Sequence, residues 1–439
     1  MTLLLKFEPS LRRNLIIFFC ASLCFWGGLS GMLPNLSPYI KSFDATNQEI
    51  GWVMASFAIG LLGMRPKMAR FTDRAGRKPA LLVGIMVIAI APLLYLSVQA
   101  IPSITFTLPG TPWSIKSAVL LLAMVRAFHG ISIAAFATAY SAAVADMAPP
   151  QHRGELIGYM SLSNPLGMAF GPAMGGYLQG NFTLAFLTMT ALGTIGTICV
   201  LATREPSRSP VDEPLARAVN APAPKRAKRS EYGAFWRLLF APHIRVPALI
   251  LAMVGIAFGS MVAFVPLYAS QMDVAVNIGL IYTVSAIASF SIRALSGKAS
   301  DQLGRGRFIS LGLACYTVSM LILATADSAQ MFLLAGAFQG AGSGTLIPII
   351  AALMADRSRP NERGLTFGLC LTGFDLGIAL AGPVMGTIAD IGGYSVVFAL
   401  SGLMTFLGLV AFVTTSSKDL PHSIRFALRG GRDVYALKS

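Results

Sequence analysis

The sequence predicts an all-α integral membrane protein built from two similar six-helix bundles, and three observations support this. Hydrophobic residues make up 55% of the chain and charged residues only 12%, which is about half the charged fraction of soluble domains. Apolar windows of about 20 residues, long enough to cross a bilayer, recur along the chain. The second half repeats patterns of the first at constant spacings, which indicates a duplicated membrane unit.

The apolar windows predict twelve membrane spans. They lie near residues 14–36, 48–68, 79–98, 118–145, 155–178, 182–202, 245–270, 277–298, 308–326, 330–354, 365–388 and 394–414. With the N-terminus inside, the cytoplasmic segments hold 30 of the 34 Lys and Arg residues. Because basic loops stay on the cytoplasmic side, we expect a multi-pass protein of the cell (inner) membrane with both termini cytoplasmic. The net charge of +15 then reflects topology, and no nucleic-acid partner is expected.

The repeat is clearest in two loops that match at an offset of 228. The first is Arg65-x3-Ala69-Arg70-x2-Asp73-Arg74-Ala75-Gly76-Arg77-Lys78, and the second is Arg293-x3-Gly297-Lys298-x2-Asp301-Gln302-Leu303-Gly304-Arg305-Gly306-Arg307. A second register, at an offset of 210, carries Asp146 onto Asp356 and Gly167 onto Gly377. The two offsets differ by 18, the length of a loop at residues 100–117 that the second half lacks.

The chain is therefore divided into an N-terminal bundle (1–202), a cytoplasmic linker (203–243), a C-terminal bundle (244–415) and a cytoplasmic tail (416–439). The linker is rich in Pro, Ala, Lys and Arg, which cannot bury a core. Its basic cluster at residues 225–229 either anchors the topology or contacts anionic lipid headgroups. The residues that follow, EYGAFWRLLF, are expected to form a short amphipathic helix on the membrane surface.

The fifth span carries a glycine-rich pattern. It is Gly158-x8-Gly167-x3-Gly171-Pro172-x2-Gly175-Gly176. Gly167, Gly171 and Gly175 fall four apart and share one helix face, along which a neighbouring backbone can approach closely. Pro172 removes a backbone hydrogen bond and bends the helix. The pattern fits either simple packing or a helix that moves against its neighbours.

Breaks in the repeat point to chemistry. Arg126 corresponds to Gly336 and Asp375 to Pro165. A charge at mid-membrane costs at least ~2.5–3.5 kcal/mol on insertion scales, so it persists only with a partner or a role. Asp375 lies near the midplane of the eleventh span and is the first candidate for proton coupling. The alternative is an Asp paired with a neighbouring helix or held by backbone donors near the adjacent glycines.

Arg126 lies in the outer half of the fourth span, with His129 about one turn deeper on the same face. Because an arginine keeps its proton, its part would be electrostatic, either binding an anionic group or acting on a nearby acid. His129 can titrate, although a histidine in a helix of Ala and Ser is more often a hydrogen-bonded core residue. Both are candidates for the coupling site.

These motifs resemble the major facilitator superfamily of transporters over essentially the whole chain. The two loops resemble its signature between spans two and three, repeated between spans eight and nine, with Ala69 in the place of the usual Gly and Gly297 kept in the second copy. Arg126-x2-His129-Gly130 resembles its fourth-span motif. The fifth-span pattern matches, at every position, the one associated with drug–proton antiporters of the family.

The resemblance implies twelve helices in two pseudo-symmetric bundles and alternating access to a site near the midplane. It supports a coupling role for Arg126. It also implies that the loop motifs lock the cytoplasmic side in one state and release it in the other, although topology alone would also explain them. The residues of this gate motif are Ala69, Asp73, Arg74, Gly76, Arg77, Lys78, Gly297, Asp301, Gly304 and Arg305.

The substrate pocket is expected near the midplane between the two bundles. Its candidate lining residues are Asn35, Phe136, Tyr140, Asn164, Tyr282 and Gln339. Ordinary packing is the alternative for each of them. Together they suggest a mostly apolar, weakly polar cavity.

The main hypothesis is secondary active transport, with proton-coupled efflux of a small amphiphilic molecule or drug. The alternative is a symporter or facilitator that imports a sugar or an organic anion. A membrane enzyme or a non-transporting sensor is a third hypothesis. The sequence has no nucleophile–base pair, metal-ligand cluster or nucleotide-binding loop. We therefore expect no enzyme activity, metal or cofactor, a proton gradient as the energy source, and a monomer in the lipid bilayer.

Overall fold

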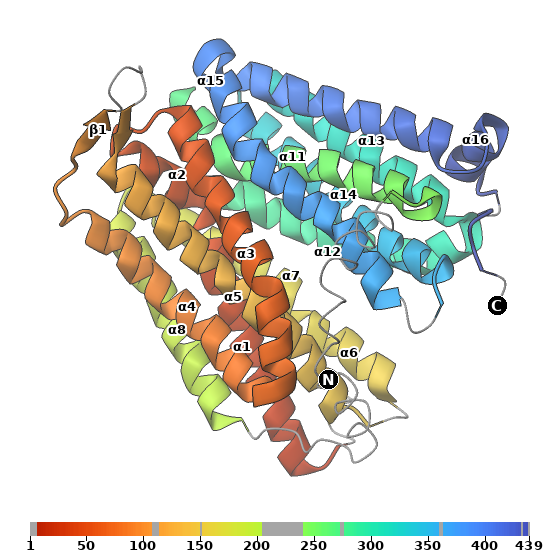
Figure 1. The fold of residues 1–439 in the computed structure, drawn as a ribbon, viewed down its shortest axis with the longest axis horizontal. Helices are drawn as coiled ribbons and strands as arrows, with labels where there is room; N and C mark the ends of the chain where they lie inside the picture. The colour runs from red at the N-terminus through yellow and green to blue at the C-terminus, as the bar shows by residue number, and fades with distance from the viewer. Residues whose placement is uncertain are drawn as a thin grey trace, which may run out of the picture. The chain divides into compact units, whose positions relative to one another are not determined.

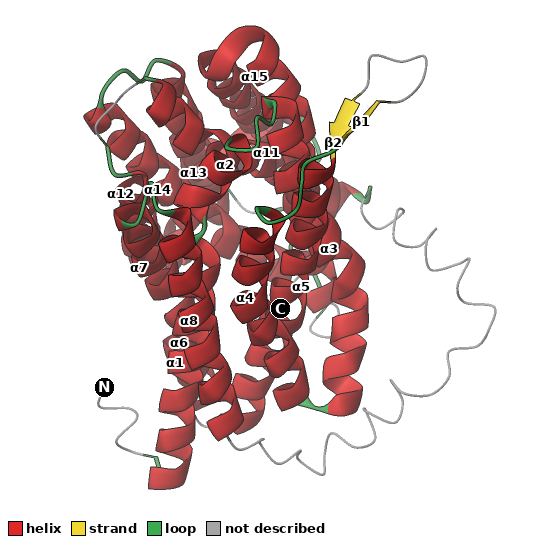
Figure 2. Cartoon of the chain, turned by 90° about the vertical axis from the view of Figure 1, so that its left-hand side faces the viewer, coloured by secondary structure: helices red, strands yellow, loops and turns green. Residues whose placement is uncertain are grey.

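The computed structural model describes residues 7–107, 114–149, 152–203, 240–272, 276–359, 363–431 and 433–437. Most of these residues are helical (Figure 2). Strands β1 (Thr105–Thr107) and β2 (Ser114–Lys116) form a short antiparallel pair within the loop that only the first half carries. The predicted basic cluster at 225–229 and all but the last residue of the expected surface helix at 231–240 lie outside the described residues.

The chain forms two compact units. The N-terminal unit comprises the described residues within Met1–Ala45 and Ser56–Ala223, and the C-terminal unit those within Thr46–Ala55 and Pro224–Ser439. The first turns of α3 (Asn47–Ala75) therefore belong to the C-terminal unit. There the backbone N–H groups of Asn47 and Gln48 donate to the Asp390 carboxylate at 3.0 and 2.9 Å. The carboxylate satisfies two of the donors that a helix N-terminus leaves open.

The N-terminal unit is helical apart from the β1–β2 loop and short connections. Its helices are α1 (Pro9–Gly31), α2 (Leu33–Lys41), the rest of α3, α4 (Arg77–Val98), α5 (Ser117–Met147), α6 (Arg153–Ser161), α7 (Ser163–Tyr177) and α8 (Phe182–Ala202) (Figure 1). Helix α1 packs on α7 and α8, and α4 packs on α5 and α8. The pairs α1–α2 and α6–α7 each cover most of one predicted span, interrupted by a short break.

The C-terminal unit repeats this arrangement. Its helices are α11 (Pro242–Gln271), α12 (Ile278–Leu303), α13 (Arg305–Ala324), α14 (Ala329–Asp356), α15 (Arg363–Thr415) and α16 (Leu420–Arg429). Helix α11 packs on α15, and α13 packs on α14 and α15. Helix α15 contains two predicted spans, because Gly393, with a φ of +78°, makes a non-helical turn within it.

Nine helices in the described part of the chain are long and apolar enough to cross a membrane. The number is below twelve because α15 holds two predicted spans, the α6–α7 span is broken, and α3 continues into the charged loop motif. The predicted all-α membrane fold is thus confirmed, and twelve spans are consistent with it.

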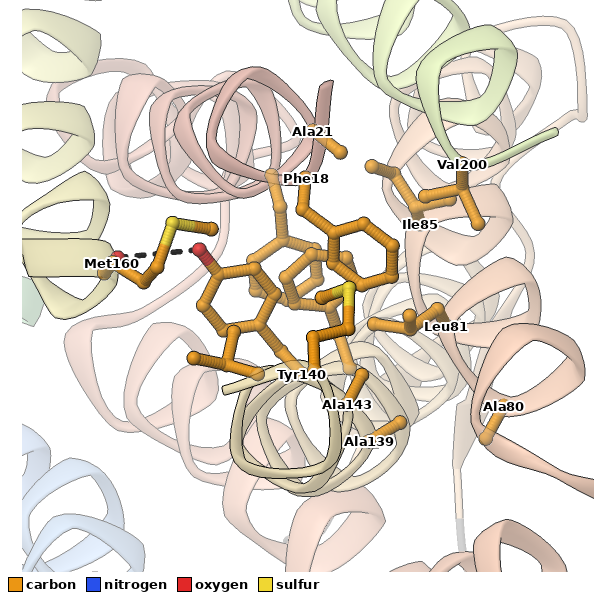
Figure 3. Packing of buried hydrophobic residues seen from close by; sticks show 14 of the residues in the cluster. Phe18, Ala21, Ala80, Leu81, Ile85, Ala139, Tyr140, Ala143, Met160 and Val200 are labelled. Atoms are coloured by element: carbon orange, nitrogen blue, oxygen red, sulfur yellow. Dashed lines mark hydrogen bonds between the residues drawn. The ribbon is translucent and has the colours of Figure 1, made fainter. Parts of the chain in front are cut away.

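The core of the N-terminal unit gathers aromatic side chains from α1 and α5. The rings of Phe25 and Phe136 stack with centroids 4.0 Å apart, and Tyr140 lies 5.6 Å from Phe136. The Tyr140 hydroxyl donates to the Met160 carbonyl at 3.2 Å (Figure 3). Phe136 and Tyr140 therefore have a packing role, which is the alternative to lining a pocket.

Helix α16 lies in the segment predicted only as a cytoplasmic tail. It packs on α13 and α15 of the C-terminal unit. One face of α16, made of Ser423, Phe426 and Ala427, is buried. The first part of this segment is thus a folded part of the C-terminal unit.

Candidate functional site

The first loop motif joins α3 to α4 through Gly76, whose φ of +105° is accessible to glycine without strain. Across this turn, Arg77 Nη1 lies 3.5 Å from Asp73 Oδ1. Arg77 Nε also donates to Asp146 Oδ2 at 2.9 Å, at the end of α5. One arginine therefore ties the α3–α4 turn to the end of α5.

The second loop motif has the same construction. Gly304, with a φ of +96°, joins α12 to α13. Arg305 Nη1 lies 3.0 Å from Asp301 Oδ1, and Arg305 Nε pairs closely with Asp356 at the end of α14. Arg77 and Arg305 are related by the offset of 228, and their partners Asp146 and Asp356 by the offset of 210. The same ion pair therefore occurs in both units, although two different offsets relate its members.

The next basic residue in each motif holds the chain that follows the bundle's last helix. Lys78 Nζ donates to the carbonyls of Leu201 and Thr203, both at 2.8 Å, where α8 ends. Arg307 donates to the carbonyls of Leu428 and Arg429, at 3.2 and 2.7 Å, where α16 ends. Each loop motif therefore gathers several helix ends at one side of its own unit.

The first loop motif has Ala69 where the family usually has glycine, and the equivalent Gly297 of the second copy shows why alanine is tolerated there. A Cβ added at Gly297 would meet no atom within 4 Å. An alanine is therefore sterically acceptable at such a position. Arg74, the remaining residue of the first motif, is exposed.

The fifth-span glycines hold α7 against α1. A Cβ on Gly167 would lie 2.6 Å from Trp26 Cβ, and one on Gly175 would overlap the Gly31 carbonyl. Gly171 likewise faces the Gly27 carbonyl. Their local role is thus close packing within the N-terminal unit, while a part in transport motion remains a prediction. Pro172 and Gly176 are buried in α7, and Gly158 has open space around it.

Arg126 is buried in α5, with 5% of the residue exposed. Its Nη1 lies 3.4 Å from His129 Nδ1, and its Cζ lies 4.5 Å from the centroid of the Phe57 ring. Among the described residues, its Nε has no hydrogen-bond partner and no carboxylate lies within 4.0 Å of its guanidinium. Tyr95 also interacts with Arg126. A phenyl ring, a histidine and a tyrosine hydroxyl do not provide a carboxylate that would neutralise this buried cation.

Two glycines bring Arg126 and Phe57 together. A Cβ on Gly60 would overlap the Ala127 carbonyl, and one on Gly130 would overlap the Phe57 carbonyl. Because both lack a side chain, α3 and α5 approach closely enough for the Phe57 ring to cover the guanidinium. The sequence pattern gave no indication of Phe57, because this contact depends on the approach of two helices.

Asp375 is also buried, with 6% exposed, in α15 of the C-terminal unit. It lies between Gly373 and Gly377, where the missing Cβ atoms let α15 approach the Ala248 and Ala252 carbonyls of α11. The two unrepeated charges of the spans, Asp375 and Arg126, therefore come from different units. Arg126 and His129 are brought together within one unit.

Most of the remaining candidate pocket residues form hydrogen bonds within the protein. Asn35 Nδ2 donates to the Gly175 carbonyl at 2.6 Å, which fixes α2 to α7. The Tyr282 hydroxyl donates to the Met261 carbonyl at 3.4 Å, and Gln339 Nε2 donates to the Tyr316 hydroxyl at 3.0 Å. Gln339 Oε1 also accepts from Ser285. Asn164 is partly exposed at the start of α7.

This chain is similar to known resistance, export and transport proteins. It is 22% identical to "Multidrug resistance protein 2" of Bacillus subtilis over 87% of this chain and 90% of the relative. It is 23% identical to "Staphylopine export protein" of Staphylococcus aureus, covering 83% and 87%. A solved structure of the nucleoside transporter NupG shares the fold, with a TM-score of 0.67, 14% identity, and coverage of 92% and 98%.

These similarities confirm the prediction of a membrane transporter and not an enzyme. A bacterial homologue of the human lysosomal transporter Spinster also shares the fold, with a TM-score of 0.66, 15% identity, and coverage of 96% of this chain and 97% of that one. The family model of the Major Facilitator Superfamily matches residues 18–301 and 275–431. Together the matches span most of the sequence, and this chain therefore belongs to the Major Facilitator Superfamily.

Proposed function

We propose that this transporter exports a small amphiphilic molecule in exchange for protons. The observation that carries the proposal is the buried carboxylate of Asp375, which has no counterpart in the repeat. A carboxylate inside a membrane-spanning helix is costly and is usually retained for function. Export is supported by similarity to multidrug resistance proteins and to a staphylopine export protein.

In this scheme Asp375 carries the exchanged proton. It takes up a proton when the site is open to the outer side and releases it on the inner side, where substrate binds. Arg126 supplies a fixed positive charge that accepts an anionic group of the substrate or favours the ionised form of an acid. Movement between the two states follows the alternating access of duplicated carriers.

The first experiment finds a substrate. The protein is expressed in an efflux-deficient bacterial host, and growth is compared over a broad panel of toxic compounds. Compounds whose inhibitory concentration rises are then used in everted membrane vesicles. For an exporter, an inside-acid gradient should drive their uptake into these vesicles. Uptake only under the opposite gradient would favour symport, for which the buried cation at Arg126 suggests an organic anion.

The second experiment tests Asp375 with the same compound. Asp375→Asn should abolish gradient-driven uptake but keep exchange of labelled for unlabelled substrate without a gradient. Asp327→Asn makes the same chemical change at an exposed position between α13 and α14 and should transport normally. Full gradient-driven transport by Asp375→Asn, at equal expression, would remove Asp375 from the mechanism.

A further inference from the structure

Helix α16 is fixed to the end of the C-terminal unit by one of its faces. Phe426 and Ala427 are buried, and the Ser310 hydroxyl of α13 donates to the Ala427 carbonyl at 3.0 Å. Arg307 donates to the next two carbonyls. These contacts satisfy acceptors that a helix C-terminus leaves open, and they set the rotation of α16 about its own axis.

A second face of α16 is apolar and uncovered. Leu420, Ile424 and Leu428 follow one another at four-residue spacing and therefore form one stripe. They are 51%, 37% and 53% exposed, respectively. Three large aliphatic side chains on a ten-residue helix expose apolar surface that is stabilised by an apolar environment.

A third face is basic. Arg425 and Arg429 are exposed beside the apolar stripe, and the exposed Lys418 precedes the helix. Arg425 also lines a hollow of about 590 Å³ together with His422, Gly430 and Gly431. Asp433 lines the same hollow, and its carboxylate is paired with Arg357. Within the described part of the chain, no carboxylate lies within 4.0 Å of any of these three cations.

The acids nearest in sequence have other partners. Asp433 pairs with Arg357 at 2.7 Å, and Asp419 pairs with His422 at 2.5 Å. Arg425 and Arg429 therefore have no ion-pair partner among the described residues, while Lys418 interacts through its charge with the neighbouring Asp419. An anionic surface would complement the two arginines.

The position of α16 indicates where that anionic surface lies. Only residues 416–419 separate α16 from α15, whose second half is the last predicted span. Helix α16 packs on α13 and α15 and lies near the start of α13 (Figure 1). It is therefore close to the point where membrane-spanning helices leave the bilayer. An apolar stripe beside a basic face at that level is typical of helices that lie in the bilayer interface.

We propose that this surface of α16, made of Lys418, Leu420, Ile424, Arg425, Leu428 and Arg429, binds anionic phospholipids of the adjacent leaflet. The apolar stripe enters the boundary between headgroups and acyl chains. Arg425 contacts a lipid phosphate at the hollow, and the other two cations add attraction. Because Arg307 holds the last turn of α16, lipid binding also orders the second loop motif.

The test uses the full-length protein in nanodiscs of phosphatidylcholine, with or without phosphatidylglycerol. Hydrogen exchange of the α16 amides is the measurement. Phosphatidylglycerol should raise their protection about tenfold or more, given roughly fivefold for each cation near a charged surface. The variant Lys418→Gln/Arg425→Gln/Arg429→Gln should lose this rise. The matched control Arg12→Gln/Arg13→Gln/Arg359→Gln removes the same charge elsewhere and should keep it.

Two further measurements test whether the apolar stripe is needed and whether a free anion can replace the lipid. Leu420→Gln/Leu428→Gln keeps all three cations and should lower α16 protection in both lipid mixtures, because the stripe no longer enters the membrane. Inorganic phosphate added to the protein in detergent should change little. The proposal is overturned if phosphatidylglycerol gives no protection in the unmodified protein, if the triple Gln variant responds as the unmodified protein does, or if free phosphate has the same effect as the lipid.

Discussion

The two copies of the loop motif contain the same ion pairs but differ in the segments that pack beside these pairs. Arg77 pairs with Asp146 in the N-terminal unit, and Arg305 pairs with Asp356 in the C-terminal unit. In both, the arginine sits directly after a glycine of positive φ. Duplication has thus preserved the link between the loop and the end of the bundle's fourth span.

In the second copy a cover, made of α16 and the glycine that follows it, packs against the turn. A Cβ on Gly304 would lie 2.6 Å from Gly430 Cα, and one on Gly306 would overlap the Phe426 carbonyl. At the position of Gly306 the first copy has Lys78, which instead bonds to the end of α8. The same ion pair is therefore flanked by the end of α8 in the first copy and by α16 in the second.

A buried arginine holds the cover of the second copy in place. Arg357, with a side chain 1% exposed, donates to Asp433 at 2.7 and 3.0 Å. It also donates to the carbonyls of His243 and Ser416, at 2.8 and 3.3 Å. At the matching position the first half has Met147. The arginine is therefore specific to the C-terminal unit.

Loss of this arginine should destabilise the protein more than any other change considered for the loop motifs. Arg357→Met introduces the residue of the first half, removes the arginine from two carbonyls, and leaves Asp433 with the Tyr435 backbone N–H but without its cationic partner. Removing one partner of a buried ion pair typically costs about 3–5 kcal/mol. Thermal unfolding in detergent should show a corresponding drop in stability, confined to the C-terminal unit when followed by hydrogen exchange.

The double variant Arg357→Met/Asp433→Asn should recover part of that loss, because no buried charge remains unpaired. Arg359→Met, at an exposed position nearby, is the control and should unfold as the unmodified protein does. Equal stability of Arg357→Met and the control would mean that the cover is held by other contacts.

The next effect concerns Gly306 itself. Gly306→Lys copies the first half at this position and forces a side chain into the space occupied by Phe426. Overpacking of this kind costs about 1–3 kcal/mol, and we expect α16 to detach locally while the bundle stays folded. Limited proteolysis near residue 430 is the measurement.

Gly297→Ala provides the matched control, because its added Cβ meets nothing within 4 Å. It should leave the proteolysis pattern unchanged. A Gly306→Lys variant that resists cleavage as well as the control does would show that α16 is not seated on this glycine.

The sequence predicted the parts of the molecule that repeat. The offset of 228 placed Arg77 and Arg305 in equivalent loops, and the offset of 210 placed Asp146 and Asp356 at equivalent helix ends. Neither offset alone showed that each arginine contacts the aspartate of its own unit. The apolar windows located the helices, because burial in a bilayer requires long apolar segments.

The parts that the sequence missed depend on contacts between distant segments. Helix α16 has ten residues, too few to register as a span, and its faces are defined only by packing on α13 and α15. Phe57 reaches Arg126 only because two glycines let α3 and α5 approach. Phe136 and Tyr140 are core residues, and nothing in an aromatic pattern distinguishes a core side chain from one that lines a pocket.

A smaller effect tests whether the two shared ion pairs are equivalent. The arginine side chains are 20% and 22% exposed in the first and second copies. In double-mutant cycles with Arg→Gln and Asp→Asn, we expect similar coupling energies of about 1–2 kcal/mol for Arg77–Asp146 and Arg305–Asp356, reduced from fully buried pairs by solvent. Chemical denaturation of the four variants and two double variants gives both values.

A clearly larger coupling in the second copy would indicate that the cover shields the Arg305 pair from water and strengthens it. A coupling energy near zero in either copy would show that the interaction between those two side chains does not stabilise the folded protein. Equal coupling energies would support the interpretation that the ion pair contributes the same stability with or without α16 packed beside it.

The smallest expected effect is a pH dependence that only the covered copy has. The pKa of Asp419 lies below its ordinary value of 3.8, first because the His422 backbone N–H donates to it and then because of the His422 ring and Lys418. A lowered pKa in the folded state means that the cap stabilises α16 above pH 3.8 and that this contribution is lost as the pH falls through the folded value.

Protection of the first-turn amides of α16, measured by hydrogen exchange, should therefore be constant from neutral pH to about 4 and fall below it. Asp419→Asn keeps a capping oxygen and should be insensitive to pH over this range, whereas Asp419→Ala should expose these amides at every pH. The turn at Gly76 belongs to the N-terminal unit and α16 to the C-terminal unit, so this turn should show no such step. A step of equal size at Gly76 would mean that acid loosens the loop pairs themselves, and the cover would then not account for the difference between the two copies.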